Sequence, residues 1–86
     1  MKTTKTELIN QTVNVTAIRF GRKFEPIPQR IEFGGRSIHF IDEGIRFKIT
    51  RGQRITRLFD MSDGRQHFRL RQVANETNWQ LVSISA

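Results

Sequence analysis

The chain has 86 residues, no cysteine and a net charge of +7 at pH 7. This length and composition predict one small domain without disulfides, and a cysteine-free chain suits a reducing compartment, so we expect a cytoplasmic protein. No apolar run exceeds two residues, which excludes a membrane-spanning segment and gives the start of the chain no signal-peptide character.

The positive charge is concentrated in the middle of the chain. Residues 19–71 hold thirteen Lys or Arg against six Asp or Glu, whereas the flanking residues balance to zero. Eleven of the fifteen basic residues are arginine, whose planar guanidinium suits the geometry of phosphate and carboxylate groups. Nucleic acid and acidic proteins are therefore both candidate partners, beside the alternative of a solvated surface that binds neither.

The first third of the chain predicts a tail, a bent strand and a stiff loop. Residues 1–10 are polar, and we expect a flexible tail, or a frayed lead into the first strand, ahead of a single β domain over 11–86. A strand is predicted over 12–20, with a bulge near Ala17, where the apolar alternation changes phase. Two prolines in 21–28 predict an extended loop.

The centre of the chain predicts consecutive β-hairpins. Apolar residues alternate with polar ones over 29–33, 36–41 and 45–50, which is the period of a half-buried strand. Gly34-Gly35 and the segment 42–44 separate these strands as tight turns.

Three further strands are predicted over 54–61, 66–73 and 79–84. Asp63-Gly64 is a strong turn signal before the second of them, and 75–78 forms the next turn. Arg57 stands among apolar positions, which predicts either a bulge or an edge strand. The last strand is apolar on both faces, which predicts a closing strand covered on two sides.

Six to seven short antiparallel strands without a convincing helix predict an all-β fold. We expect a small barrel or a highly curled sheet, which resembles SH3-like barrels in general architecture over roughly residues 12–84. This resemblance is architectural and carries no family motif, so it implies no function.

The alternation predicts a core face and an opposite, basic face. The core face is expected to hold Ile31, Phe33, Ile38, Phe40, Ile45, Phe47, Ile49, Phe68 and Leu70. The opposite face is expected to hold a nucleic-acid-binding patch of Arg30, His39, Arg46, Lys48, Arg54, Arg69 and Arg71. Such a patch would contact the phosphates of DNA or RNA with low sequence specificity. The aromatics outside the core pattern, Phe20, Phe24 and Trp79, are expected to pack at the core or its rim, so no base stacking is predicted.

The alternative is a protein-interaction or structural domain, whose partner is acidic or pairs with an open sheet edge. We expect a non-enzymatic monomer or weak homo-oligomer, with no catalytic residue, cofactor or metal site. His39 and His67 at outward strand positions are weak candidates for acid–base chemistry. The carboxylates of 42–43, Asp60 and Asp63 cluster at predicted turns, where acidic residues occur for backbone reasons alone.

Overall fold

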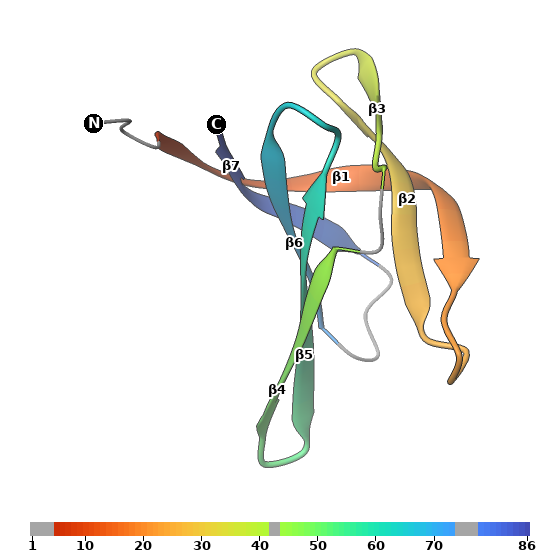
Figure 1. The fold of residues 1–86 in the computed structure, drawn as a ribbon. Helices are drawn as coiled ribbons and strands as arrows, with labels where there is room; N and C mark the ends of the chain where they lie inside the picture. The colour runs from red at the N-terminus through yellow and green to blue at the C-terminus, as the bar shows by residue number, and fades with distance from the viewer. Residues whose placement is uncertain (1–4, 42–43, 74–77) are drawn as a thin grey trace.

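The computed structural model describes residues 5–41, 44–73 and 78–86, which form seven strands and no helix. The strands are β1 (Thr6–Phe20), β2 (Pro26–Phe33), β3 (Arg36–His39), β4 (Ile45–Arg51), β5 (Arg54–Ser62), β6 (His67–Val73) and β7 (Trp79–Ser85). They build one antiparallel sheet in the order β3-β2-β1-β7-β6-β5-β4 (Figure 1). The all-β prediction is therefore confirmed. Among the described residues there is no helix that could span a membrane.

Strand β1 joins the two halves of the sheet. Its first part pairs with β7 as far as Val13, and its second part pairs with β2 from Asn14 onward. The register of β1 against β2 shifts on both sides of Ala17, so the predicted bulge is confirmed. A second register shift lies between Leu8 and Gln11. Bulges bend a strand and increase its twist. This bending allows one strand to pair with β7 in one half of the sheet and with β2 in the other half.

The expected flexible tail over 1–10 is wrong for residues 6–10, which belong to β1. Thr6 pairs with Ser85 and Leu8 with Ser83. Backbone hydrogen bonding to β7 orders this segment, although its side chains offer little apolar surface to bury. Residues 1–4 lie outside the described part of the chain.

The core lies between the two halves of the sheet. Its buried apolar residues come from both halves, and are Val13, Ile27, Ile31, Ile38, Phe59, Met61, Phe68, Leu70, Trp79 and Leu81. The rings of Phe59 and Trp79 contact each other with centroids 5.2 Å apart, and those of Phe40 and Phe68 with centroids 5.6 Å apart. Burial of this cluster holds the folded-over sheet together.

The sheet is not closed, so the expected barrel and its SH3-like detail are not confirmed. Strands β3 and β4 are its two edges. Just after β3, the Ile41 N–H donates to the carbonyl of Ser62 in β5 at 2.9 Å. The chain just after the edge strand β3 therefore comes near the end of β5 without forming a continuous ladder.

The core face predicted from alternation is correct for β2, β3 and β6 and wrong for β4. Ile31, Ile38, Phe68 and Leu70 are buried, and Phe33 and Phe40 are partly buried against the core. In β4, however, Ile45, Phe47 and Ile49 are 62%, 44% and 44% exposed. The reason is the register of the hairpin: Phe47 lies opposite Leu58, whereas the buried Phe59 lies opposite Arg46, so the apolar side of β4 is turned away from the core. Alternation identifies an apolar face but not whether anything covers it.

The turn predictions that fall on described residues are confirmed by backbone geometry. Gly34, Gly35 and Gly64 have φ values of 60°, 74° and 97°, which glycine adopts without steric cost. The carboxylate Oδ1 of Asp63 accepts the backbone N–H groups of Arg65 and Gln66, each at 2.8 Å. The turn signals at residues 42–43 and 75–77 lie outside the described residues.

Two expectations about strand boundaries and irregularities are wrong. The proline segment is not a loop to residue 28, because β2 begins at Pro26 and Pro28 pairs with Ile18 of β1. Prolines are accommodated here beside the bulged part of β1. Arg57 needs neither a bulge nor an edge, since it pairs in regular register with Lys48 and Gln72 inside the sheet.

The two-faced pattern of the last strand has a different cause from the one expected. Strand β7 lies between β1 and β6 in the middle of the sheet. A register shift against β6 falls between the pair Arg69–Ser83 and the pair Leu70–Leu81. Ile84 accordingly faces the core, while Val82 lines the opposite face. A bulge, not closure of a barrel, produces the change of phase.

Candidate functional site

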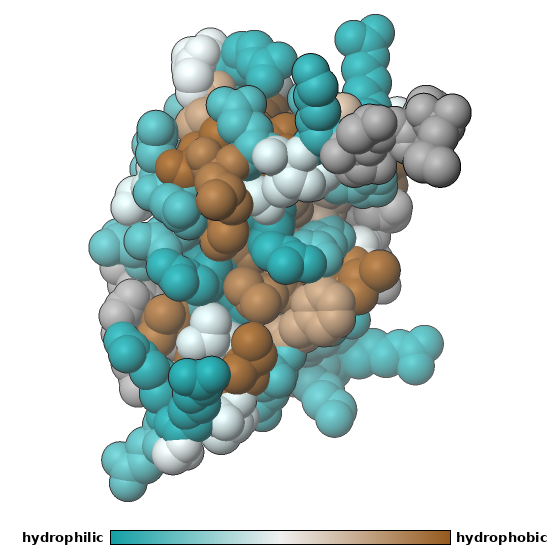
Figure 2. Space-filling view, turned by 90° about the vertical axis from the view of Figure 1, so that its left-hand side faces the viewer, coloured by the Kyte–Doolittle hydropathy of each residue, from teal (hydrophilic) through white to brown (hydrophobic). Residues whose placement is uncertain are grey.

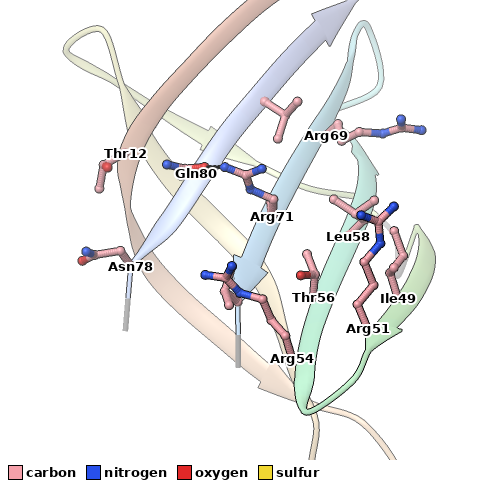
Figure 3. A pocket seen from close by; sticks show the side chains of 12 residues that line it. Thr12, Ile49, Arg51, Arg54, Thr56, Leu58, Arg69, Arg71, Asn78 and Gln80 are labelled. Atoms are coloured by element: carbon pink, nitrogen blue, oxygen red, sulfur yellow. Dashed lines mark hydrogen bonds between the residues drawn. The ribbon is translucent and has the colours of Figure 1, made fainter. Parts of the chain in front are cut away.

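The outer face of β4 to β7, which is the face turned away from the core, carries a groove of about 720 Å³. Residues directly opposite one another in an antiparallel ladder project from the same face. Ile49 pairs with Thr56 and Thr56 with Val73, so these three side chains lie across one level of this face. We call this hollow the outer groove. Its charged and aliphatic lining residues are Arg51, Arg54, Arg69, Arg71, Ile49, Leu58, Val73 and Val82 (Figure 3).

Four arginines from three neighbouring strands line the outer groove. Arg51 comes from β4, Arg54 from β5, and Arg69 and Arg71 from β6 (Figure 3). No Asp or Glu is among the lining residues that the structure describes. This surface is therefore strongly cationic, and its guanidinium groups match the planar, bidentate geometry of carboxylate and phosphate groups.

Two of these arginines are held in place by neighbours. The Arg69 Nε and a terminal nitrogen donate to the two carboxylate oxygens of Asp60 at 2.7 and 2.8 Å. These hydrogen bonds raise the pKa of Arg69 above its ordinary value. The guanidinium of Arg71 donates to Oε1 of Gln80 on β7. Asp60 already occupies part of the hydrogen-bonding capacity of Arg69, and Gln80 orients Arg71.

The floor between the arginines is aliphatic. Leu58, Val73 and Val82 are partly buried there, and Ile49 is more exposed. The same face of β4 continues through Phe47 to Ile45, because both alternate in phase with Ile49. On the side of the molecule shown in Figure 2, hydrophobic side chains reach the surface in patches between hydrophilic ones. The outer groove thus combines an apolar floor with a cationic rim.

The seven residues predicted to form one basic patch lie on three separate surfaces. Arg54, Arg69 and Arg71 meet in the outer groove. Arg30 and His39 are cross-strand neighbours on β2 and β3, on the outer face of the other half of the sheet. The Nε of Arg30 donates to Oγ1 of Thr16 at 2.8 Å.

Arg46 and Lys48 form the third surface, on the side of β4 that faces away from the outer groove. Arg46 makes an ion pair of 2.8 Å with Glu25 of the β1–β2 connection. Backbone N–H donors, its own first, and Arg46 hold the pKa of Glu25 below its ordinary value. The expectation of one basic face is therefore wrong. Folding the sheet over itself turns its two outer faces apart, and β4 presents its apolar side to the groove.

Sequence analysis missed two features of the surface. Arg51 lines the groove because Gly52-Gln53 is a two-residue turn that places it opposite Arg54. Phe20 at the end of β1 is 66% exposed and Phe24 in the β1–β2 connection is 84% exposed, so the expectation of core or rim packing is wrong for both. It is confirmed only for Trp79, which is buried.

The two exposed phenylalanines stand beside cations. Arg22 and Lys23 lie between them in the sequence and are exposed. Phe24 has a φ of 61°, which is unusual for a bulky residue. Its N–H donates to the carbonyl of Gly21 at 3.0 Å, and the Gly21 N–H donates to the carbonyl of Glu25 at 2.9 Å. A tight, hydrogen-bonded turn thus presents Phe24 to solvent.

The two histidines lie apart. His39 is on the outer face of β3, whereas His67 is on β6 beside a second, smaller hollow that adjoins the outer groove and shares Arg69 with it. Within residues 5–41, 44–73 and 78–86, no three His, Asp or Glu side chains come together in a way that could hold a metal ion. Comparison with protein-family models, curated proteins and solved structures finds no match. The chemistry of the surface is therefore what indicates the function of this chain.

Proposed function

We propose that the chain is a non-enzymatic protein-interaction domain whose outer groove binds an acidic, amphipathic segment of a partner protein. One observation carries the proposal: in the described part of the chain, four arginines from three strands surround an aliphatic floor, and no carboxylate is among the residues that line it. Carboxylates of a partner would accept charge-assisted hydrogen bonds from the guanidinium groups. Apolar side chains of the same segment would cover the floor, which is the common arrangement of a protein interface.

The same groove suits nucleic acid less well. Grooves that bind single strands without sequence preference stack bases on aromatic side chains, whereas this floor consists of Ile49, Leu58, Val73 and Val82. The seven residues expected to contact phosphates are also divided among three surfaces. Apolar side chains of a protein are stabilised when they are buried against an aliphatic floor, so this floor favours a protein as the ligand.

Nucleic-acid binding is the second candidate function, and a different surface favours it. Phe20 and Phe24 are exposed next to Arg22 and Lys23 in the β1–β2 connection. Exposed aromatics interleaved with cations are the combination that single-strand binders use to stack bases and contact phosphates. Two to three phosphate contacts there would give a slope of log K against log salt of roughly −1.4 to −2.

The test of the first proposal is binding of a fluorescently labelled peptide of glutamate and valine, measured by anisotropy in low salt. Arg71→Glu should weaken binding by about tenfold or more, because it replaces a charge-assisted hydrogen bond by repulsion. Arg36→Glu makes the same change of charge on the exposed edge strand β3 and should alter the affinity by less than about twofold. Equal losses in both variants, or no binding by the parent protein, would contradict the proposal.

A labelled deoxythymidine oligonucleotide tests the second candidate with the same variants. If the β1–β2 connection binds bases, Phe24→Ala should weaken oligonucleotide binding by roughly fivefold or more, since stacking contributes about 1–3 kcal/mol per base. Arg71→Glu should affect it only weakly. The opposite order of effects would place nucleic acid in the outer groove and displace the acidic peptide as its partner.

A further inference from the structure

The edge strand β4 borders the outer groove and has an open side. We propose that the partner segment binds as an extended strand that pairs with β4 and adds an eighth strand to the sheet. This inference rests on the proposed function and extends it to the edge of the groove, where the apolar side chains of the segment would lie against the groove side of β4 and its carboxylates would lie beside Arg46 and Lys48 on the opposite side. Addition of a strand to an exposed sheet edge is a recurrent mode of peptide recognition, in which main-chain hydrogen bonds supply affinity.

The backbone of β4 has hydrogen-bonding groups directed outward. Arg51 pairs with Arg54 across the turn Gly52-Gln53, and Gly52 has a φ of 59°. A two-residue hairpin turn is closed by a hydrogen-bonded pair, and hydrogen-bonded pairs alternate with non-hydrogen-bonded ones along the ladder. The non-hydrogen-bonded positions of β4 are therefore Arg46, Lys48 and Thr50. Their N–H and C=O groups point away from β5, toward the side where the described sheet ends.

The side chains of β4 favour a strand with two different faces. Ile45, Phe47 and Ile49 point to the groove side and remain 62%, 44% and 44% exposed. An exposed apolar edge of this kind is an aggregation hazard unless another chain covers it. An added strand would place every second side chain beside these three residues, so those side chains should be apolar.

The side of β4 that carries Arg46 and Lys48 determines which residues are favourable at the other alternate positions of the added strand. On this face Lys48 lies directly opposite Arg57. Like charges in directly opposite positions destabilise a ladder. A carboxylate placed beside Lys48 by the added strand would offset this repulsion. The partner segment should therefore alternate acidic and aliphatic residues, with the acidic ones opposite Arg46, Lys48 and Thr50.

The same charges make a second copy of this chain a poor occupant. Pairing of β4 with another β4 would bring Arg46 and Lys48 next to the same cations of the other molecule. Each chain also carries a net charge of +7, so association would have to overcome repulsion. Charge complementarity selects an acidic partner over self-association.

The test compares three seven-residue peptides of alternating glutamate and valine with capped ends. One is unmodified, one carries N-methyl groups on the glutamates, and one carries them on the valines. In the proposed register only the glutamate N–H groups point at β4. Methylation of the glutamates should weaken binding at least about tenfold, since it removes several backbone hydrogen bonds, whereas methylation of the valines should change it less than about threefold.

The outcomes separate this inference from the proposed function. Equal affinities of all three peptides would overturn strand addition and leave groove binding intact, whereas no binding by any of them would overturn both. The variant Lys48→Pro, compared with Lys48→Ala, checks the same point from the protein side. Proline removes the outward N–H of residue 48 and preserves the ladder to β5, so Lys48→Pro should weaken binding clearly more than Lys48→Ala does. If Lys48→Pro fails to fold, the peptide series still decides. Dimerisation of the free protein that is lost in Lys48→Pro would overturn the choice of an acidic partner.

Discussion

Two phenylalanines on neighbouring strands should respond very differently to the same substitution. Phe59 of β5 is 1% exposed and contacts Trp79, with ring centroids 5.2 Å apart. Phe47 of β4 is 44% exposed. Phe59→Ala removes a ring from a closed core and leaves a cavity, whereas Phe47→Ala removes a ring that already contacts solvent. The pair therefore measures how far the core extends along the β4–β5 hairpin.

The expected loss in free energy of unfolding for each variant follows from how deeply the phenylalanine is buried. Phe59→Ala should lower the free energy of unfolding by about 3–5 kcal/mol, the usual cost of truncating a buried phenylalanine. For Phe47, little more than half of the residue is buried, and complete burial contributes about 1.5–3 kcal/mol. Phe47→Ala should therefore cost about 1–1.5 kcal/mol. A difference of about 2 kcal/mol between the variants corresponds to about 8–16 °C in Tm for a domain of this size.

Urea denaturation and thermal melts of both variants provide the measurement. The free-energy cost of Phe59→Ala can exceed the total stability of a small domain. Phe59→Leu is therefore measured as well, since this milder substitution keeps a folded population. If Phe47→Ala proves as costly as Phe59→Ala, the β4–β5 hairpin packs against the core and the outer groove as described here does not exist.

Two further predictions concern turns and pH. Gly64→Val should cost about 1–2 kcal/mol from the φ of 97° alone, since a Cβ there meets only Ile41 Cδ1 at 3.8 Å. Gly44→Ala should cost more in the same thermal melts, because its φ is 65° and the new Cβ would collide with the carbonyl oxygen of Asp60. Backbone donors, that of Gln66 first, hold the pKa of Asp63 below its ordinary value of 3.8. A lowered folded-state pKa adds stability that is present above pH 3.8 and is lost as the pH falls below it. Asp63→Asn should therefore flatten the fall in Tm between about pH 4 and pH 2, and an unchanged slope would contradict this assignment.

Local signals in the sequence predicted six to seven strands and several of the turns that the structure describes, but not where β1 and β2 begin. Gly34-Gly35 and Asp63-Gly64 adopt the expected backbone because turn geometry depends on a few adjacent residues. The phase change at Ala17 predicted a real bulge for the same reason. Strand type and turn position are short-range properties, and the residues that determine them are neighbours in the chain.

The tertiary structure alone decided which side chains share a surface. Alternation places Phe47 and Arg46 on opposite sides of their own strand, but only the register against β5 decides which side faces the core, and there Arg46 lies opposite the buried Phe59. The expected basic patch separated for a related reason. Strand β1 pairs with β2 on one side and with the distant β7 on the other, so the sheet folds over and turns Arg30 away from Arg71. Register and strand order are set by packing between segments far apart in sequence, which a period of two along one strand does not encode.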